Sequence, residues 1–183
     1  MLLRLPEVVA RKEVYDVTDE EWSVVLQAVE AAIEELLSFR RQEGEALARK
    51  FKANIDNISS LLAQVEPFEK ERVEKIRSRI EDALGKLPSV DYDRNRLEQE
   101  LIYYIEKLDV NEEKQRLTNH LAYFVSTMGG SIGQGKKLGF IAQEMGREIN
   151  TLGSKSNHAE MQNIVVKMKD ELEQIKEQVL NVM

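Results

Sequence analysis

The stretch EMGREINTLGSKS, residues 144–156, places an apolar face and a charged row side by side on one predicted helix. Read at about 3.6 residues per turn, the apolar arc consists of Leu138, Ile141, Met145, Ile149 and Leu152. The neighbouring arc consists of Glu144, Glu148, Thr151 and Lys155, with Arg147 at its edge. The charged row therefore borders a buried face, where a pair of carboxylates needs a cation, a base or a proton to be tolerated.

A similar row precedes it in the chain. Glu112, Arg116 and His120 lie one turn apart, Glu113 lies at the edge of this row, and the apolar side holds Leu117, Leu121 and Phe124. If the two helices pack antiparallel, the two rows face each other. Together they would offer oxygen and imidazole ligands for a divalent metal, a general base, and cations for a phosphate.

Each of these groups also has a purely structural interpretation. Glu and Arg or Lys one turn apart on a helix commonly form solvated ion pairs worth less than about 1 kcal/mol. His120 fits a structural hydrogen-bonding role, and His158 fits a helix cap or a surface position.

The stretch GGSIGQGKKLG, residues 129–139, predicts a loop between these helices because five of its eleven residues are glycine. It lacks the residue order of a phosphate-binding P-loop and belongs to no βαβ unit, which excludes a Walker-type site. It remains either a hinge or a loop whose amides, with Lys136 or Lys137, wrap a phosphate.

The first half of the chain predicts further long helices. Asp16 or Thr18 caps a helix that runs to about Phe39, and Gly44 interrupts the helical pattern, for which close helix packing is one reason. This helix carries an apolar stripe, expected to be buried, of Trp22, Val25, Leu26, Val29, Ile33, Leu36 and Leu37.

A second helix is expected over residues 45–84, kinked or restarted at Pro67 and ended by Gly85 and Pro88. Its stripe is Leu47, Phe51, Ile55, Ile58, Leu62 and Val65. The simplest arrangement makes these two long helices antiparallel, with a shorter helix over about 91–108.

The remaining residues predict a C-terminal helical unit. Asp109 to Glu112 has capping-box spacing and starts a helix that ends near Met128, and an amphipathic helix covers about His158 to Val182. We therefore predict an all-α protein: an elongated helical bundle with long antiparallel helices over residues 1–108, joined to a C-terminal three-helix unit over 109–183.

Composition limits the function classes. The 183 residues include 42% hydrophobic and 32% charged residues and no cysteine, which excludes disulfides and thiolate chemistry. A net charge of −7 argues against a general polyanion-binding surface but leaves room for a local basic patch. Without a signal peptide or an apolar run that could span a membrane, we expect a cytoplasmic protein without membrane partners.

Three stretches resemble one family. DVNEEKQRLTNHLAYF (109–124), LGFIAQEMGREINTLGSKS (138–156) and ELEQIKEQVLNV (171–182) closely resemble the C-terminal domain of the bacterial YicC/YloC proteins. LLRLPEV (2–8) and RRQEGEAL (40–47) extend the resemblance more weakly. Two residues depart from the family pattern: Gly139 replaces the usual Asp, and Gly146 replaces the usual Asn.

The resemblance implies a divalent-metal-dependent endoribonuclease, a nuclease of the hydrolase class, that works in an oligomeric ring, a hexamer in the intact family protein. It also implies an N-terminal domain that we expect to be absent here, which makes this chain a fragment. The alternatives are a helical oligomerisation module, whose charges form ion pairs between helices, and an RNA-binding module, neither active on its own.

The resemblance also carries residue roles. Glu113, His120, Glu144 and Glu148 match family positions that we assign to catalysis, and Glu144 and Glu148 with Glu113 would bind Mg²⁺ or Mn²⁺. His120 would act as a base or a second ligand. The expected RNA-binding residues are Arg116, Lys136, Arg147 and Lys155.

Overall fold

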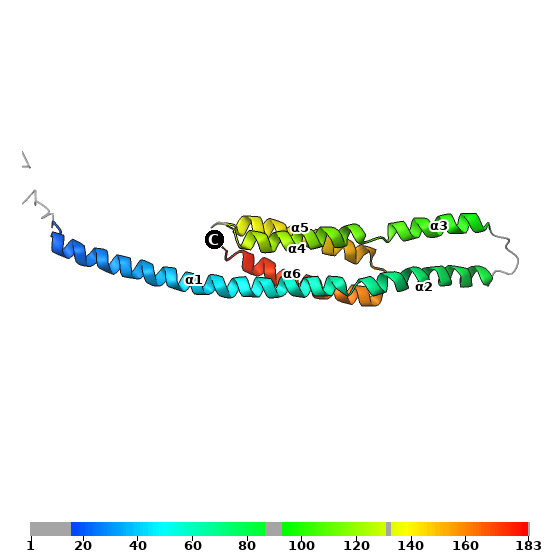
Figure 1. The fold of residues 1–183 in the computed structure, drawn as a ribbon, viewed down its shortest axis with the longest axis horizontal. Helices are drawn as coiled ribbons and strands as arrows, with labels where there is room; N and C mark the ends of the chain where they lie inside the picture. The colour runs from blue at the N-terminus through cyan, green and yellow to red at the C-terminus, as the bar shows by residue number, and fades with distance from the viewer. Residues whose placement is uncertain (1–15, 87–92, 131–132, 183) are drawn as a thin grey trace, which may run out of the picture. The chain divides into compact units, whose positions relative to one another are not determined.

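The computed structural model describes residues 16–86, 93–130 and 133–182, and within these ranges the chain is helical without strands (Figure 1). The all-α prediction is therefore confirmed. The lead-in predicted before Asp16 and the role of Pro88 lie outside the described residues. The helices are α1 (Asp19–Ala63), α2 (Glu66–Gly85), α3 (Arg94–Lys107), α4 (Asn111–Met128), α5 (Gly135–Lys155) and α6 (Ala159–Val179).

The chain divides into two compact units, residues 1–43 and 44–183, and α1 contributes to both. Of the two predicted caps it is Thr18 that caps this helix, in a capping box in which the Thr18 hydroxyl oxygen accepts from the Glu21 amide while the Glu21 carboxylate accepts from the Thr18 amide. Reciprocal satisfaction of these amides fixes the start of α1.

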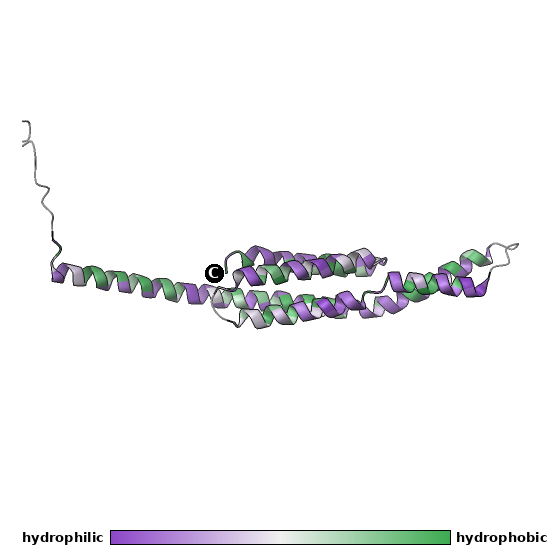
Figure 2. Cartoon of the chain, turned by 90° about the horizontal axis from the view of Figure 1, so that it is seen from above, coloured by the Kyte–Doolittle hydropathy of each residue, from purple (hydrophilic) through white to green (hydrophobic). Residues whose placement is uncertain are grey.

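The apolar row in the first unit is exposed, so the prediction that it is a buried stripe is wrong for this chain. Its seven members, Trp22 to Leu37, are each 45–59% exposed. In Figure 2 their hydrophobic colour recurs along the start of α1. The periodicity correctly marked an amphipathic helix, but the described part of this unit holds no second helix to cover it.

Gly44 does not end a helix, which corrects the predicted break. α1 continues through it, and a side chain added at Gly44 would meet no other described atom within 4 Å, so close helix packing is not its role here. The chain breaks instead at Gln64 and Val65, and α2 starts with Pro67 in its first turn. In the second unit, the end of α1 and α2 run one way while α3 and α4 return antiparallel to them (Figure 1).

The core of the second unit joins α1, α4, α5 and α6. The predicted stripe from Phe51 to Val65 is buried, with Leu47 partly buried, and the Phe51 ring meets the edge of Phe124 at a centroid distance of 5.5 Å. The Asn54 side chain donates to the Glu171 carbonyl oxygen (3.1 Å), which ties α1 to α6. This core draws on residues before and after position 108. The predicted boundary between two domains at 108/109 stays a prediction.

The glycine-rich connection between α4 and α5 is shorter than expected, since α5 already begins at Gly135. A side chain at Gly135 would overlap the carbonyl oxygen of Val182, which follows α6. Only glycine therefore lets α5 start at this point. The predicted loop over 129–139 is thus wrong for its second half.

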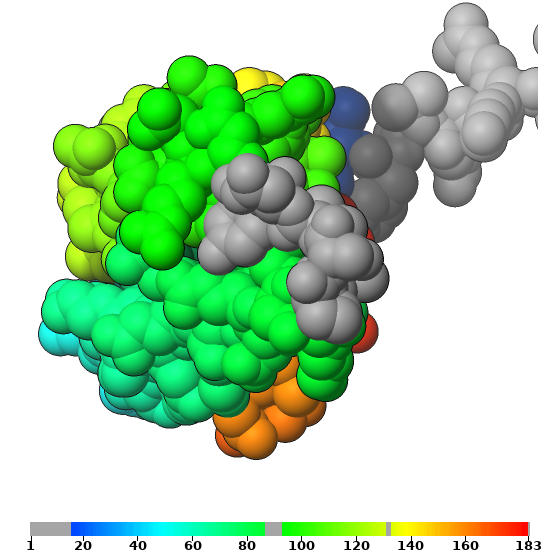
Figure 3. All heavy atoms as spheres, turned by 90° about the vertical axis from the view of Figure 1, so that its right-hand side faces the viewer, coloured from blue at the N-terminus to red at the C-terminus, as the bar shows by residue number. Residues whose placement is uncertain are grey.

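Figure 3 looks onto the end of the second unit that is formed by α2 and α3. Asp93 caps α3, its carboxylate accepting from the Asn95 amide (2.9 Å). None of the helices in the described ranges combines the length and apolar character that a membrane crossing requires.

Candidate functional site

The two charged rows lie against each other because α4 and α5 pack antiparallel. Nη1 of Arg116 on α4 lies 3.9 Å from Oε1 of Glu148 on α5, and Nζ of Lys155 lies 2.7 Å from Oε1 of Glu113. Since Arg116 follows Glu113 on α4 while Glu148 precedes Lys155 on α5, the rows run in opposite directions. Residues of the two rows that were predicted to face each other therefore do meet.

Glu113 and Lys155 form the buried end of this row. Glu113 is 5% exposed, and its Oε2 has no hydrogen-bond partner among the described residues. Lys155 also donates to the Asp109 carbonyl oxygen (3.0 Å). A carboxylate this deeply buried depends on its cation, so Lys155 holds the start of α4 against the end of α5.

The middle of the row is more open. Glu148 is 9% exposed, yet its one cationic partner in the described part of the chain, Arg116, lies beyond hydrogen-bond length and also pairs with Glu112. Glu144 accepts from Arg147 at 2.7 Å, and the side chains of Arg116 and Arg147 are 57% and 71% exposed. Both arginines are accessible to an anion from solvent.

The two histidines and Lys136 lie at three separate positions in the second unit. His120 is half-buried one turn beyond Arg116 on α4, in the direction in which α5 runs back to Glu144. Lys136 is exposed at the start of α5. His158 is the N-cap residue of α6, as one of its two predicted places required, although its side chain makes no cap hydrogen bond. It is not a surface residue, since its side chain is 12% exposed and its ring packs on Phe68 at a centroid distance of 5.2 Å.

A set of three converging metal ligands is not formed. Within the described residues, no group of three or more His, Asp or Glu side chains gathers as a metal site. Glu113 therefore does not join Glu144 and Glu148 in one ligand set. These two lie one turn apart on α5 and remain a possible pair of oxygen ligands.

Gly146 and Gly139 face away from this row, toward α6. A side chain at Gly146 would lie 3.3 Å from Leu172 Cδ2, and one at Gly139 would lie 3.5 Å from Val179 Cγ1. The two departures from the family pattern therefore change the packing of α5 on α6 and remove no group from the charged row.

Arg72 is a buried residue that the sequence reasoning missed. It is 5% exposed, and its guanidinium donates to the carbonyl oxygens of Lys155 (2.9 Å) and Leu108 (2.6 Å). Burial lowers the pKa of Arg72, while the charges of Glu69 and Asp109 raise it. This side chain joins α2 to the C-terminal ends of α3 and α5, which periodicity within α2 cannot reveal.

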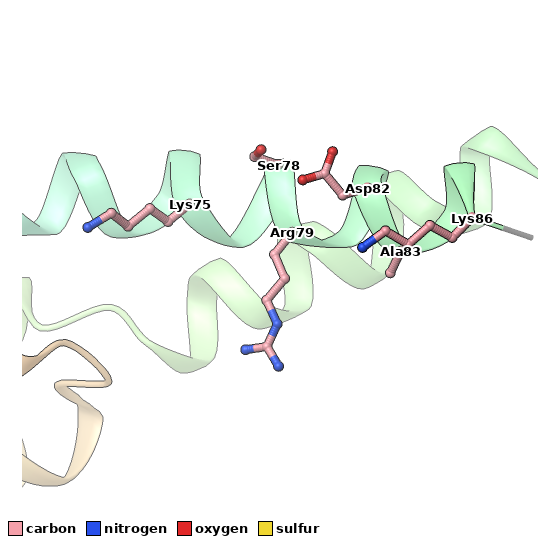
Figure 4. Close-up of a pocket in the computed structure, with 6 residues that line it drawn as sticks. All are labelled: Lys75, Ser78, Arg79, Asp82, Ala83 and Lys86. Carbon is pink, nitrogen blue, oxygen red and sulfur yellow. The ribbon is translucent and has the colours of Figure 1, made fainter.

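A shallow hollow on α2 is separate from the charged row, because its lining residues come from α2 and its C-cap residue Lys86 (Figure 4). The Arg79 guanidinium points away from the Asp82 carboxylate. The lining residues are Lys75, Ser78, Arg79, Asp82, Ala83 and Lys86.

Two parts of the chain match models of known protein families. Residues 63–183 match the family model described as endoribonuclease YicC-like, C-terminal, and residues 1–49 match the one described as endoribonuclease YicC-like, N-terminal region. The second match corrects the expectation that the N-terminal domain is absent, because part of that region is present at the start of this chain.

Two curated relatives are similar over nearly all of the chain. It is 35% identical over 182 residues to a probable endoribonuclease YicC of Clostridioides difficile (strain 630). It is 32% identical over 187 residues to a probable endoribonuclease YicC of Haemophilus influenzae. Each alignment covers 98% of this chain and 62% of the relative, so the chain spans less than two thirds of their length.

Proposed function

The chain belongs to the YicC-like endoribonuclease family, and from that premise we propose that it acts in the cleavage of cytoplasmic single-stranded or hairpin RNA, with the α4–α5 row as one wall of the site. The observation that carries this proposal is the meeting of Arg116 with Glu148 across the two helices. It brings the row of α4, with its arginine and histidine, beside the carboxylates of α5, and these are the kinds of group that phosphodiester cleavage uses.

The two exposed arginines are suited to hold the RNA phosphate. Each arginine pairs with one carboxylate, Glu112 or Glu144, and because the arginine of each pair is more than half exposed, such a pair is worth at most about 1 kcal/mol. A phosphate can therefore replace either partner at little cost and accept paired hydrogen bonds from a guanidinium. Lys136 would extend this contact at the start of α5.

Glu144 and Glu148 would hold the divalent metal. Mg²⁺ commonly binds one or two carboxylates together with phosphate oxygens of the substrate, so two ligands on α5 suffice for the proposal. The observation in favour is the Glu148 carboxylate, which is 9% exposed but lacks a cation at hydrogen-bond distance in the described residues. A bound Mg²⁺ or Mn²⁺ would supply charge neutralisation at the phosphate.

His120 would accept the proton of the attacking oxygen. It lies half-buried on α4, on the side that runs toward Glu144. Glu113 and Lys155 act differently in this proposal, since their mutual ion pair and the Asp109 contact leave them engaged in holding the helices. Direct binding of substrate by Lys155 stays a prediction.

A cleavage assay tests this function. RNA is incubated with the chain in Mg²⁺, in Mn²⁺ and in EDTA, and product is expected only with metal. Glu144→Gln should abolish cleavage while leaving the thermal unfolding midpoint nearly unchanged, because Glu144 pairs only with a mostly exposed arginine. The matched control is Glu173→Gln on α6, whose carboxylate pairs with Lys176 (3.4 Å), and it should keep full activity.

Full activity of Glu144→Gln would overturn the catalytic assignment. A metal response in thermal unfolding that persists in the double variant Glu144→Ala/Glu148→Ala would overturn the metal assignment separately. Salt-sensitive RNA binding without metal-dependent products would favour the binding-module alternative.

A second candidate function is assembly with further copies of the chain, favoured by the exposed row on α1. Trp22, Leu26, Val29, Ile33 and Leu36 follow the alternating spacing of a helix-pairing seam. The first turn of α1 is acidic and residues 40 and 41 are arginines, so an antiparallel second copy would pair opposite charges. We propose that this face makes the homo-oligomer contact.

Sedimentation equilibrium tests the oligomer. Val29→Glu should dissociate the assembly, whereas Val166→Glu on α6, where the valine is 54% exposed, should leave it intact. A monomeric parent chain, or an assembly unaffected by Val29→Glu, would refute this contact.

A further inference from the structure

Two aromatic side chains are exposed where α4 ends and α5 begins. Tyr123 is 48% exposed and Phe140 is 60% exposed. Burying a Phe side chain stabilises a protein by about 1.5–3 kcal/mol, and Phe140 does not gain most of this free energy. Their exposure is therefore a feature that folding of the chain does not explain.

The two rings continue the charged row. Phe140 precedes Glu144 by one turn on α5, and Tyr123 follows His120 by about one turn on α4. Nζ of Lys137 lies over the Tyr123 ring, 4.9 Å from its centroid, and so links the two helices at this point. This cation–π contact orients the ring beside the proposed cleavage site before any ligand arrives.

The segment of the chain that carries both rings has charge of one sign. Residues 121–143 include Lys136 and Lys137 and contain no Asp or Glu, in a chain whose net charge is −7. An apolar protein segment would gain nothing from the two lysines. A ligand with a flat aromatic face and an adjacent negative charge fits both features, and an unpaired nucleotide has both.

We propose that Tyr123 and Phe140, flanked by Lys136 and Lys137, form a stacking site for an unpaired base of the RNA strand beside the phosphate that is cut. The inference rests on the proposed function and deepens it, because it predicts a preference for single-stranded RNA. Bases inside a duplex are stacked on each other and cannot lie on these rings, whereas a single strand or a loop can.

Fluorescence anisotropy in EDTA tests this site without cleavage. The probes are a short labelled single-stranded RNA, the same strand in a blunt duplex, and the same strand with one abasic nucleotide. Phe140→Ala should raise the Kd for the single strand at least about five-fold, the low end for loss of one stacked base, and leave the duplex Kd unchanged. Phe140→Tyr should retain the single-strand affinity.

A matched control and a lysine variant separate stacking from charge. Tyr103→Ala removes an aromatic ring that is 57% exposed on α3, outside the row, and should change no affinity. Lys136→Gln should weaken single strand and duplex alike and flatten the salt dependence, because Lys136 is exposed beside the lysine that contacts the Tyr123 ring and a lysine contacts phosphate regardless of pairing. The abasic strand that loses the stacked base should bind the parent chain and Phe140→Ala equally.

The outcomes decide the proposal. Equal Kd changes for single strand and duplex in Phe140→Ala, no change in either, or a parent chain without single-strand preference would each overturn the stacking site. A preserved stacking effect with no metal-dependent cleavage would instead overturn the proposed catalytic function and leave this site standing.

Discussion

Lys155 on α5 and Glu113 on α4 form an ion pair of 2.7 Å between Nζ and Oε1, and the Glu113 side chain is only 7% exposed. The pair joins the end of one helix of the candidate site to the start of the other. It therefore fixes the spacing of the more open residues between them, and its loss should be felt in stability first.

Lys155→Met should destabilise the chain by about 3–5 kcal/mol, because it leaves a buried carboxylate without its cation. The measurement is urea unfolding followed by circular dichroism. The double variant Glu113→Met/Lys155→Met should recover part of the loss, since it removes both charges. Arg49→Met breaks a pair whose side chains are 73% and 74% exposed and should cost less than about 1 kcal/mol. Equal losses in both single variants would contradict this prediction.

Arg72→Met should lower the free energy of unfolding by several kcal/mol, because each hydrogen bond from a charged donor is worth about 1.5–3 kcal/mol and two carbonyl oxygens lose their donor. Arg72→Lys should recover only part, since one ammonium cannot reproduce the two-pronged contact. A lysine variant as stable as the parent would show that the fork geometry is unimportant.

Two Gly→Ala substitutions should have opposite signs. Gly44→Ala should stabilise α1 by about 0.5–1 kcal/mol, because the position is helical and open. Gly135→Ala should destabilise the chain because its side chain would overlap the Val182 carbonyl oxygen. Thermal unfolding midpoints measured in parallel give both signs, and a stabilised Gly135→Ala would refute the close approach.

Gly146→Asn, which installs the residue usual in the family, should lower stability by about 1 kcal/mol or more through crowding against Leu172. Cleavage per folded molecule should not change, since the position faces α6 and not the charged row. A gain in metal affinity would contradict that placement.

The acid side of the stability curve should respond to Lys75. The hydrogen bond and charge of Lys75 lower the pKa of Glu71, with a smaller contribution from His158. A lowered carboxyl pKa stabilises the fold above the ordinary pKa, and that stability is lost as pH falls through the folded-state pKa. Lys75→Gln should raise the Glu71 pKa toward its ordinary value, which NMR titration of the carboxyl measures. An unchanged pKa would rule out Lys75 as the main cause.

Much of the fold follows from periodicity alone, because the buried residues of each core helix recur at helical spacing. Phe51 on α1, Leu121 on α4 and Met168 on α6 each belong to such a series. The same signal misplaced Trp22 and its neighbours, since periodicity marks an apolar face but does not say what covers it. The helix break predicted at Gly44 was wrong for a related reason, because a glycine lowers helix propensity without necessarily ending a helix.

The candidate site was partly predictable. The two rows followed from spacing, their facing followed from spacing only under the assumption that the helices pack antiparallel, and the family resemblance supplied the reaction. Which charges are buried did not follow, so Glu113 was grouped with Glu144 and Glu148, although it pairs with Lys155 at the far end of the row. Arg72 could not be found at all, because its partners are backbone carbonyls remote in sequence.

That remoteness has a kinetic consequence. The two hydrogen bonds of Arg72 span 36 and 83 residues of chain, so each closes a long loop whose entropy is lost before the bond forms. The helices themselves depend on local contacts and can form earlier. Arg72 is therefore expected to make its contacts after the folding transition state, and its substitution should speed unfolding while leaving the refolding rate nearly unchanged.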